Sequence, residues 1–286
     1  MNKLIALLFG LFIYIPIHAQ EFIVVDENTK EPLAYATIIF PQINKGTYAD
    51  NNGKFIIPTE HEYKDSICIQ MVGYDNFRTT ISRLSDTIFL VQAVYTLQEI
   101  IVIPKGKEIK LGDLKKKKKK EIYISYKDTV FIPIIFATYI AGKDYSGCEI
   151  KKLHYRYDHP NPKIRYIVRP QLYIVSEDGK PGNTLLRQSQ ILEITGSGIL
   201  EVDISDEQIL LPNDGVFIGI EVIEEISSEP LDIKDKRNPI SLNYVSTKGA
   251  ETYLASFDDF RWVSFDWTEE KMYLRAPFAI SINCPK

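Results

Sequence analysis

The stretch from Phe22 to Val102 constrains the fold most, because short apolar runs alternate there with clusters of turn-forming residues. Residues 22–25 precede the polar segment 26–32, and the segment 50–53, Asp-Asn-Asn-Gly, separates two further runs. Asn and Asp tolerate left-handed backbone angles and Gly53 takes a positive φ without steric cost, so this segment predicts a hairpin. Short strands between tight turns indicate a small antiparallel β-sandwich.

Four parts of this stretch carry a resemblance to a known family. They are residues 22–39, residues 45–55 (Lys-Gly-Thr-Tyr-Ala-Asp-Asn-Asn-Gly-Lys-Phe), Val72-Gly73-Tyr74, and residues 97–102 (Leu-Gln-Glu-Ile-Ile-Val). Their order resembles the carboxypeptidase-regulatory-like, or transthyretin-like, domain that is abundant in exported proteins of Bacteroidota. The resemblance covers about residues 21–103, so the first domain is expected at 20–103, and it implies a Greek-key β-sandwich. It implies no activity, because the catalytic zinc domain of the carboxypeptidases is not recognisable in the chain.

The first nineteen residues have the pattern of a secretory signal peptide. Lys3 supplies the positive charge, residues 4–17 are apolar apart from a few interruptions, and Ala19 is small enough to precede a cleavage site. An uncleaved membrane anchor is the alternative, but the apolar run is shorter than the ~20 residues that a spanning helix needs. We therefore expect export to the periplasm, the outer membrane or the cell surface.

Three cysteines allow at most one disulfide within the chain. Cys68 lies in the first domain, whereas Cys148 and Cys284 lie at the two ends of the second half. An oxidising periplasm permits a bond between Cys148 and Cys284, and burial as free thiols is the alternative.

Residues 104–121 differ from the rest of the chain in charge. Nine lysines, six of them consecutive at Lys115–Lys120, stand against three acidic residues and give a net charge of +6. Because the whole chain carries −4, the remainder carries −10. Like charges repel and cannot bury a face, which indicates a solvated linker. The alternative is a docking strip at Lys115–Lys120 for envelope proteins, glycans or anionic lipid; nucleic acid is not expected for an exported chain with acidic domains.

The region 122–286 again shows strand-like alternation, with no convincing helical periodicity in the mature chain. In residues 272–284 the apolar side chains fall on one face, and Pro277 predicts a sheet edge or a bulge. The order Arg165, Leu172-Tyr-Ile, Asp178-Gly-Lys-Pro-Gly182 and Val216-Phe-Ile-Gly-Ile-Glu221 resembles a jelly-roll-type β-sandwich of uncharacterised exported Bacteroidota proteins. We therefore expect an all-β protein with a transthyretin-like first domain and a jelly-roll-like second domain.

The sequence contains no recognisable catalytic or phosphate-binding motif, so neither an enzyme nor a cofactor is expected. The nearest approach to a metal cluster is His154, Asp158 and His159, but His159 has the wrong strand parity and no third ligand is identifiable. Asp50 is a weak candidate for calcium, because turn chemistry explains it and an ion needs several more oxygen ligands. We predict no catalytic residues and no metal.

An aromatic cluster near the C-terminus is a candidate sugar-binding surface, since sandwich domains often bind glycans through aromatic platforms. Trp262, Trp267 and Tyr273 are its candidate ligand-binding residues. Trp262 and Trp267 have opposite strand parity, so at least one is expected in the core.

The function predicted first is a non-enzymatic binding or assembly module of the cell envelope. A carbohydrate-binding protein and a hydrolase with an unrecognised site are the alternatives.

Overall fold

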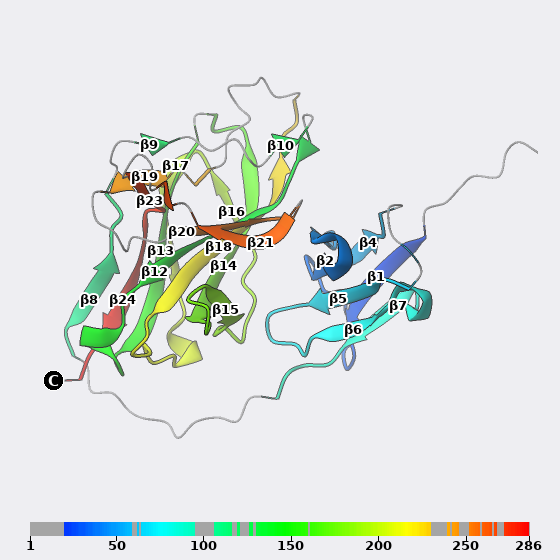
Figure 1. Ribbon diagram of the computed structural model, residues 1–286, viewed down its shortest axis with the longest axis horizontal. Coiled ribbons are helices and arrows are strands. Elements are labelled where there is room, and N and C mark those ends of the chain that lie inside the picture. The colour runs from blue at the N-terminus through cyan, green and yellow to red at the C-terminus, as the bar shows by residue number, and fades with distance from the viewer. Residues whose placement is uncertain are drawn as a thin grey trace, which may run out of the picture.

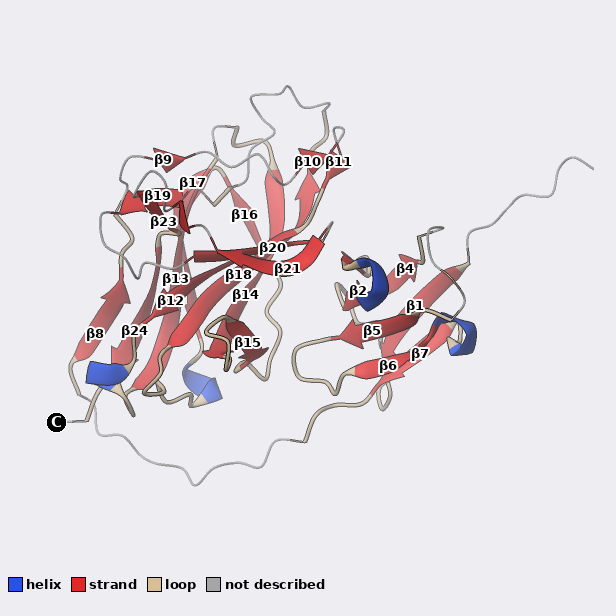
Figure 2. Cartoon of the chain, viewed as in Figure 1, coloured by secondary structure: helices blue, strands red, loops and turns tan. Residues whose placement is uncertain are grey.

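A computed structural model describes residues 20–58, 62, 64–94, 106–115, 119–120, 126–127, 130–159, 161–229, 239–240, 242–245, 252–257, 259–264, 266–267 and 272–285. Within these residues the regular structure is β-strand, apart from four short 3-10 helices, as the sequence predicted (Figure 2). No helix in the described part of the chain is long and apolar enough to cross a membrane. The predicted signal peptide, residues 1–19, lies outside the described residues.

The first domain is a sandwich of two small sheets. Its strands are β1 (Glu21–Asp26), β2 (Thr37–Phe40), β3 (Lys45–Tyr48), β4 (Lys54–Ile56), β5 (Ser66–Gln70), β6 (Phe77–Thr80) and β7 (Thr87–Leu90), with 3-10 helices η1 (Pro41–Ile43) and η2 (Ile81–Arg83). One sheet has the order β4-β1-β7 and the other β3-β2-β5-β6. Apolar side chains from both sheets, including Val24, Ile38, Ile69 and Leu90, form one buried cluster between them.

Two expectations for this domain are corrected. Strands β1 and β7 run parallel, so the sandwich is not purely antiparallel. The turn at Asp50–Gly53 forms, with Gly53 at φ +74°, but it does not close a hairpin. Strand β3 before the turn pairs with β2, whereas β4 after it pairs with β1 in the other sheet. Turn chemistry sets the reversal of the chain, but it does not determine which sheet each flanking strand joins.

The second domain contains the remaining strands and 3-10 helices η3 (Lys143–Tyr145) and η4 (Ser205–Glu207). Its strands are β8 (Glu108–Gly112), β9 (Lys119–Lys120), β10 (Tyr126–Lys127), β11 (Val130–Phe131), β12 (Ile134–Ile140), β13 (Glu149–Asp158), β14 (Arg165–Val175), β15 (Pro181–Thr184), β16 (Leu192–Thr195), β17 (Ser197–Asp203), β18 (Val216–Ile226), β19 (Leu242–Val245), β20 (Thr252–Ser256), β21 (Asp259–Ser264), β22 (Asp266–Trp267), β23 (Met272–Arg275) and β24 (Phe278–Asn283).

Two large sheets enclose the core of the second domain. The seven-stranded sheet has the order β15-β14-β18-β12-β20-β21, with β16 also paired to β14, and the facing sheet has the order β17-β13-β24-β8. Alternate side chains of β12 and β18, such as Phe136 and Ile220, meet Leu153 and Ile280 of the facing sheet in one buried cluster. The other side of the seven-stranded sheet, which carries the odd-numbered residues of β14, is turned to the first domain.

The lysine-rich segment is not a solvated linker over its whole length. Residues Glu108–Gly112 form β8, which pairs with β24 at the edge of the facing sheet. Lys119 and Lys120 pair through their backbones with β19. Like charge governs side chains, but the backbone of an extended lysine-rich segment still offers hydrogen bonds to a free sheet edge. The side chains of residues 116–120 lie outside the described part, so the predicted docking strip stays a prediction.

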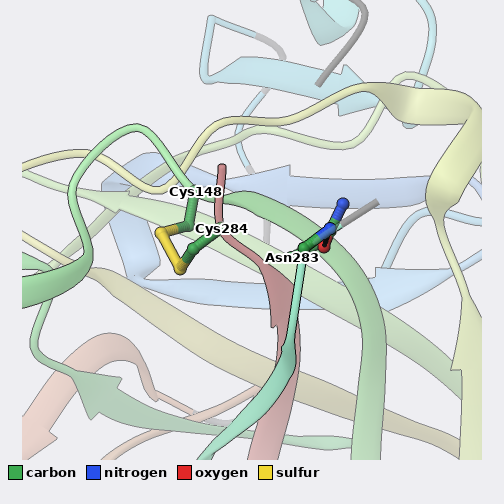
Figure 3. The surroundings of a disulfide bond; sticks show 4 residues. Cys148, Asn283 and Cys284 are labelled. Carbon is green, nitrogen blue, oxygen red and sulfur yellow. Dashed lines mark hydrogen bonds between the residues drawn. A yellow bond between two sulfur atoms is a disulfide. The ribbon is translucent and has the colours of Figure 1, made fainter. Parts of the chain in front are cut away.

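Residues 272–284 are not one strand. Ala276 and Pro277 separate β23, which pairs with β19 and β22, from β24, which lies between β13 and β8. Pro277 therefore marks a break and not an edge, because proline lacks the N–H that a continuous ladder would use. Just after β24, Cys284 is joined to Cys148 by a disulfide (Figure 3). Cys68 is a buried free thiol.

The two domains lie side by side (Figure 1). The segment between β5 and β6 reaches the second domain, where Val72 packs into the large core cluster. At a second point the amide of Gly46 donates a hydrogen bond to the carbonyl of Phe257, at 2.9 Å. Val72 is therefore a residue that the first domain contributes to the core of the second.

Candidate ligand site at the domain junction

A cavity of about 440 Å³ lies where the first domain meets the seven-stranded sheet. The first domain supplies the loop Met71–Asn76 together with Thr37 and Gln70. The second domain supplies residues of β14, β15 and β18, together with Ile135 of β12 and Trp262 of β21. We call this space the junction cavity. Its volume falls in the range that small-molecule sites occupy.

A buried ion pair forms one wall of the junction cavity. Arg169 on β14 and Glu221 on β18 are direct cross-strand partners, and they are only 1% and 5% exposed. The Nη1 atom of Arg169 lies 3.6 Å from the Oε2 atom of Glu221. Strand alternation explains their position, because the even-numbered neighbours of Arg169 face the core and turn the arginine to the opposite side.

The first domain supplies further hydrogen-bond partners for this ion pair. The guanidinium of Arg169 donates to the carbonyl of Tyr35 and, at 3.4 Å, to the hydroxyl of Thr37. Tyr48 donates to Glu221 at 2.7 Å. Tyr35 has a φ of +58°, a left-handed conformation that is uncommon outside glycine, asparagine and aspartate. This strained backbone conformation occurs at the residue whose carbonyl accepts the hydrogen bond from Arg169, so the contact with the second domain helps to hold it.

The pair is linked to further polar groups of the second domain. Gln171 donates to Glu221 at 2.7 Å, and the hydroxyl of Thr184 donates to the Gln171 side chain at 2.9 Å. Burial, together with the charge of Glu221, raises the pKa of Tyr48 well above its ordinary value. Tyr48 is therefore a neutral phenol at physiological pH, and its hydroxyl donates a hydrogen bond to the side chain of Glu221. The guanidinium of Arg169 also lies over the Tyr48 ring, 5.5 Å from its centre.

Aromatic side chains lie beside this polar wall. Trp262, half-buried on β21, contacts Tyr173 edge to face with ring centres 5.7 Å apart, and both line the cavity. Tyr173 in turn lies over Gly219, where any Cβ would come within 2.6 Å of the ring. Gly219 thus leaves the space that the tyrosine ring occupies.

The structure places the predicted aromatic residues unevenly. Trp262 reaches the junction cavity. The backbones of Trp267 and Tyr273 belong to β22 and β23, but their side chains lie outside the described part. The three residues are therefore not brought together as one described surface, and Trp262 instead joins residues that sequence reasoning did not select.

The weak metal candidates have structural partners. His154 is buried and shares a 2.9 Å hydrogen bond with Ser281, and burial lowers its pKa. Asp158 accepts a hydrogen bond from Ser197, and the His159 ring is bonded to the backbone of Asn161. The Asp50 carboxylate accepts two backbone amides of its own turn. Among the described residues, no group of three or more His, Cys, Asp and Glu side chains is placed to hold a metal ion.

Sequence reasoning missed Arg169, Gln171, Glu221 and Tyr48. A signal was present for two of them: Arg169 and Glu221 are charged residues in the middle of long apolar strand segments, 165–175 and 216–226. A charge in such a segment is rarely buried without a partner. The partner itself was not readable, because fifty-two positions of sequence separate the two residues.

The comparison with known families concerns the first domain. Residues 23–102 match the family model of the CarboxypepD_reg-like domain, which supports the resemblance inferred from residues 22–102. The chain therefore contains a regulatory-type β-domain followed by a second all-β domain that this match does not cover. No curated protein matches the chain.

Proposed function

We propose that this protein is an exported, non-enzymatic binding module of the bacterial cell envelope that holds its ligand in the junction cavity. The observation that carries the proposal is that both domains contribute residues to the walls of the cavity. Val72-Gly73-Tyr74 of the regulatory-type domain and Arg169, Gln171 and Glu221 of the second domain line the same space. In this proposal the first domain completes the binding site of the second.

Two features support export. The charged and apolar pattern of residues 1–19 is that of a secretory signal, and the disulfide between Cys148 and Cys284 is a bond that persists in oxidising compartments. The lineage, Bacteroidota, and the jelly-roll-like character of the second domain belong to the same proposal and rest on the sequence resemblances.

The chemistry of the cavity supports binding without turnover. Among its described lining residues there is no Ser, Cys or His that would act as a nucleophile or a base of ordinary pKa. Glu221 accepts hydrogen bonds from Tyr48 and Gln171 and lies beside Arg169, so its carboxylate oxygens already contact groups of the protein. In this proposal Glu221 shapes the wall of the site and takes no part in a reaction.

Export is tested by fractionating bacterial cells that express the full chain. We expect the protein in the envelope or the medium, beginning at Gln20 by N-terminal sequencing. A control variant, Leu7→Arg with Leu8→Arg, interrupts the apolar run and should stay in the cytoplasm at full length. Wild-type protein that remains cytoplasmic and begins at Met1 would contradict the proposal.

Binding is tested by native mass spectrometry after incubation with saccharide and peptide fragments released from bacterial envelopes. We expect a retained fragment whose mass is unchanged after release. Failure to retain any fragment would contradict a binding role, and the appearance of cleaved or modified fragments would contradict a non-enzymatic one.

A further inference from the structure

The polar surface of the junction cavity consists mainly of groups that both donate and accept hydrogen bonds. Gln70 and Asn76 come from the first domain, and Gln171, Asn183 and Thr184 come from the second. Carboxamides and hydroxyls offer donors and acceptors within a few ångströms of each other. The hydroxyl groups of a sugar have the same dual character.

The charges of the cavity are compensated internally. Arg169 is paired with Glu221 and with the first domain, and Glu221 receives two further donors. The remaining charged residue among the described lining is Asp75, which is exposed at the rim. An anionic ligand would find no uncompensated cation in this wall and would face Asp75. The electrostatics therefore favour a neutral ligand.

An aromatic ring completes the match. Trp262 is held edge to face against Tyr173 and is half-buried, so the indole keeps part of its surface in the cavity. Aromatic rings provide large, rigid contact areas at low entropic cost, and the C–H face of a sugar ring is the apolar surface that a polyhydroxylated ligand offers.

We propose that the junction cavity binds a short, uncharged saccharide, with Trp262 under a sugar ring and the carboxamide of Asn183 against its hydroxyls. This inference rests on the proposed binding function and specifies the class of ligand. It moves the site from a surface formed by Trp262, Trp267 and Tyr273 to a cavity that exists only when the two domains are together.

The experiment uses the mature full chain on an array of neutral oligosaccharides, of uronic-acid and sialylated oligosaccharides, and of short peptides. Hits are followed by calorimetric titration with Trp262→Ala, Trp262→Phe, Asn183→Ala and the control Val263→Ala. Val263 is the exposed neighbour of Trp262 on β21, and it is not a lining residue of the cavity. Melting temperatures identify any variant that fails to fold, and Asn183→Ala, at an exposed position, keeps the test valid if Trp262→Ala does not fold.

We expect a neutral oligosaccharide to bind, Trp262→Ala to weaken its binding about tenfold or more, and Trp262→Phe to restore part of the loss. Asn183→Ala should weaken it severalfold and Val263→Ala should leave it unchanged. Binding of peptides or charged glycans alone would overturn the saccharide class and leave the binding function intact. Saccharide binding that is indifferent to Trp262 and Asn183 would overturn the site. Cleavage of the bound saccharide would overturn the non-enzymatic function and leave the ligand class intact.

Discussion

Arg169 and Glu221 face each other across the adjacent strands β14 and β18, and the first domain covers the pair with Tyr35, Thr37 and Tyr48. A buried charge that loses its partner keeps the cost of leaving water and loses the attraction that offset it. The pair therefore connects the stability of the second domain to the presence of the first.

Glu221→Ala should destabilise the protein by about 3–5 kcal/mol, because it leaves the guanidinium of Arg169 without its buried carboxylate. Urea unfolding measures the change. The matched control is Glu193→Ala, which removes the exposed partner of Arg165, 3.1 Å away, and should cost less than about 1 kcal/mol. Equal losses for the two variants would show that burial of the pair does not matter.

Loss of the disulfide should destabilise the second domain by about 2–5 kcal/mol, because Cys148 and Cys284 are 136 positions apart and their bond restricts the unfolded chain. The loss is measured by comparing the thermal unfolding of Cys148→Ser with that of the wild-type protein. Thiol titration of the oxidised, unfolded wild-type chain should detect one free thiol, that of Cys68. Three reactive thiols would contradict the bond.

Asp26→Asn should weaken the first domain and flatten its response to acid. The Asp26 carboxylate accepts hydrogen bonds from the amides of Asn28 and Thr29 and from the side chains of Tyr74 and Gln92, at 2.7–2.8 Å. These bonds, the one from Thr29 first, hold the pKa of Asp26 well below its usual range. Stability from a lowered carboxyl pKa is present above the unfolded value, about 3.9, and is lost as the pH falls below it.

The measurement is urea unfolding of wild type and Asp26→Asn between pH 7 and pH 2. We expect the gap between the two proteins to be largest near neutral pH and to shrink below about pH 4, where Asp26 takes up a proton in the unfolded wild-type chain while it stays ionised in the folded one. A gap that stays constant over this range would mean that the charge of Asp26 does not contribute.

Gly73→Ala should disturb the contact between the domains. Gly73 has a φ of +89°, and a Cβ there would lie 2.5 Å from the backbone carbonyl oxygen of Arg187 in the second domain. Gly179→Ala is the control, since Gly179 has a φ of +76° and nothing within 4 Å of the added carbon. The control should cost about 1 kcal/mol for backbone strain alone. Gly73→Ala should cost more in urea unfolding, and limited proteolysis should cleave the chain between the domains sooner.

Strand content and turn positions were predictable from local chemistry. The strand at 216–226 and the turn at Asp50–Gly53 both appear in the structure. Val216, Ile218, Ile220 and Val222 pack into the large core cluster and Phe217 packs into another, because the alternation of side-chain faces and the tolerance of positive φ are properties of a few adjacent residues. Which strands pair with each other was harder to predict from the sequence. The hairpin expected at Gly53 is instead a crossing between sheets, and the predicted linker contains β8, because the choice of partner strand depends on which sheet edge is free.

The sequence by itself determined that this chain forms β-strands and that residues 22–102 resemble a regulatory-type domain. Only the tertiary structure decided that Tyr48 donates to Glu221 across 173 positions, that Arg169 reaches Tyr35 across 134, and that Trp262 enters a shared cavity. Strand formation reflects short-range preferences of neighbouring residues, whereas a site between two domains depends on how their folded surfaces fit together.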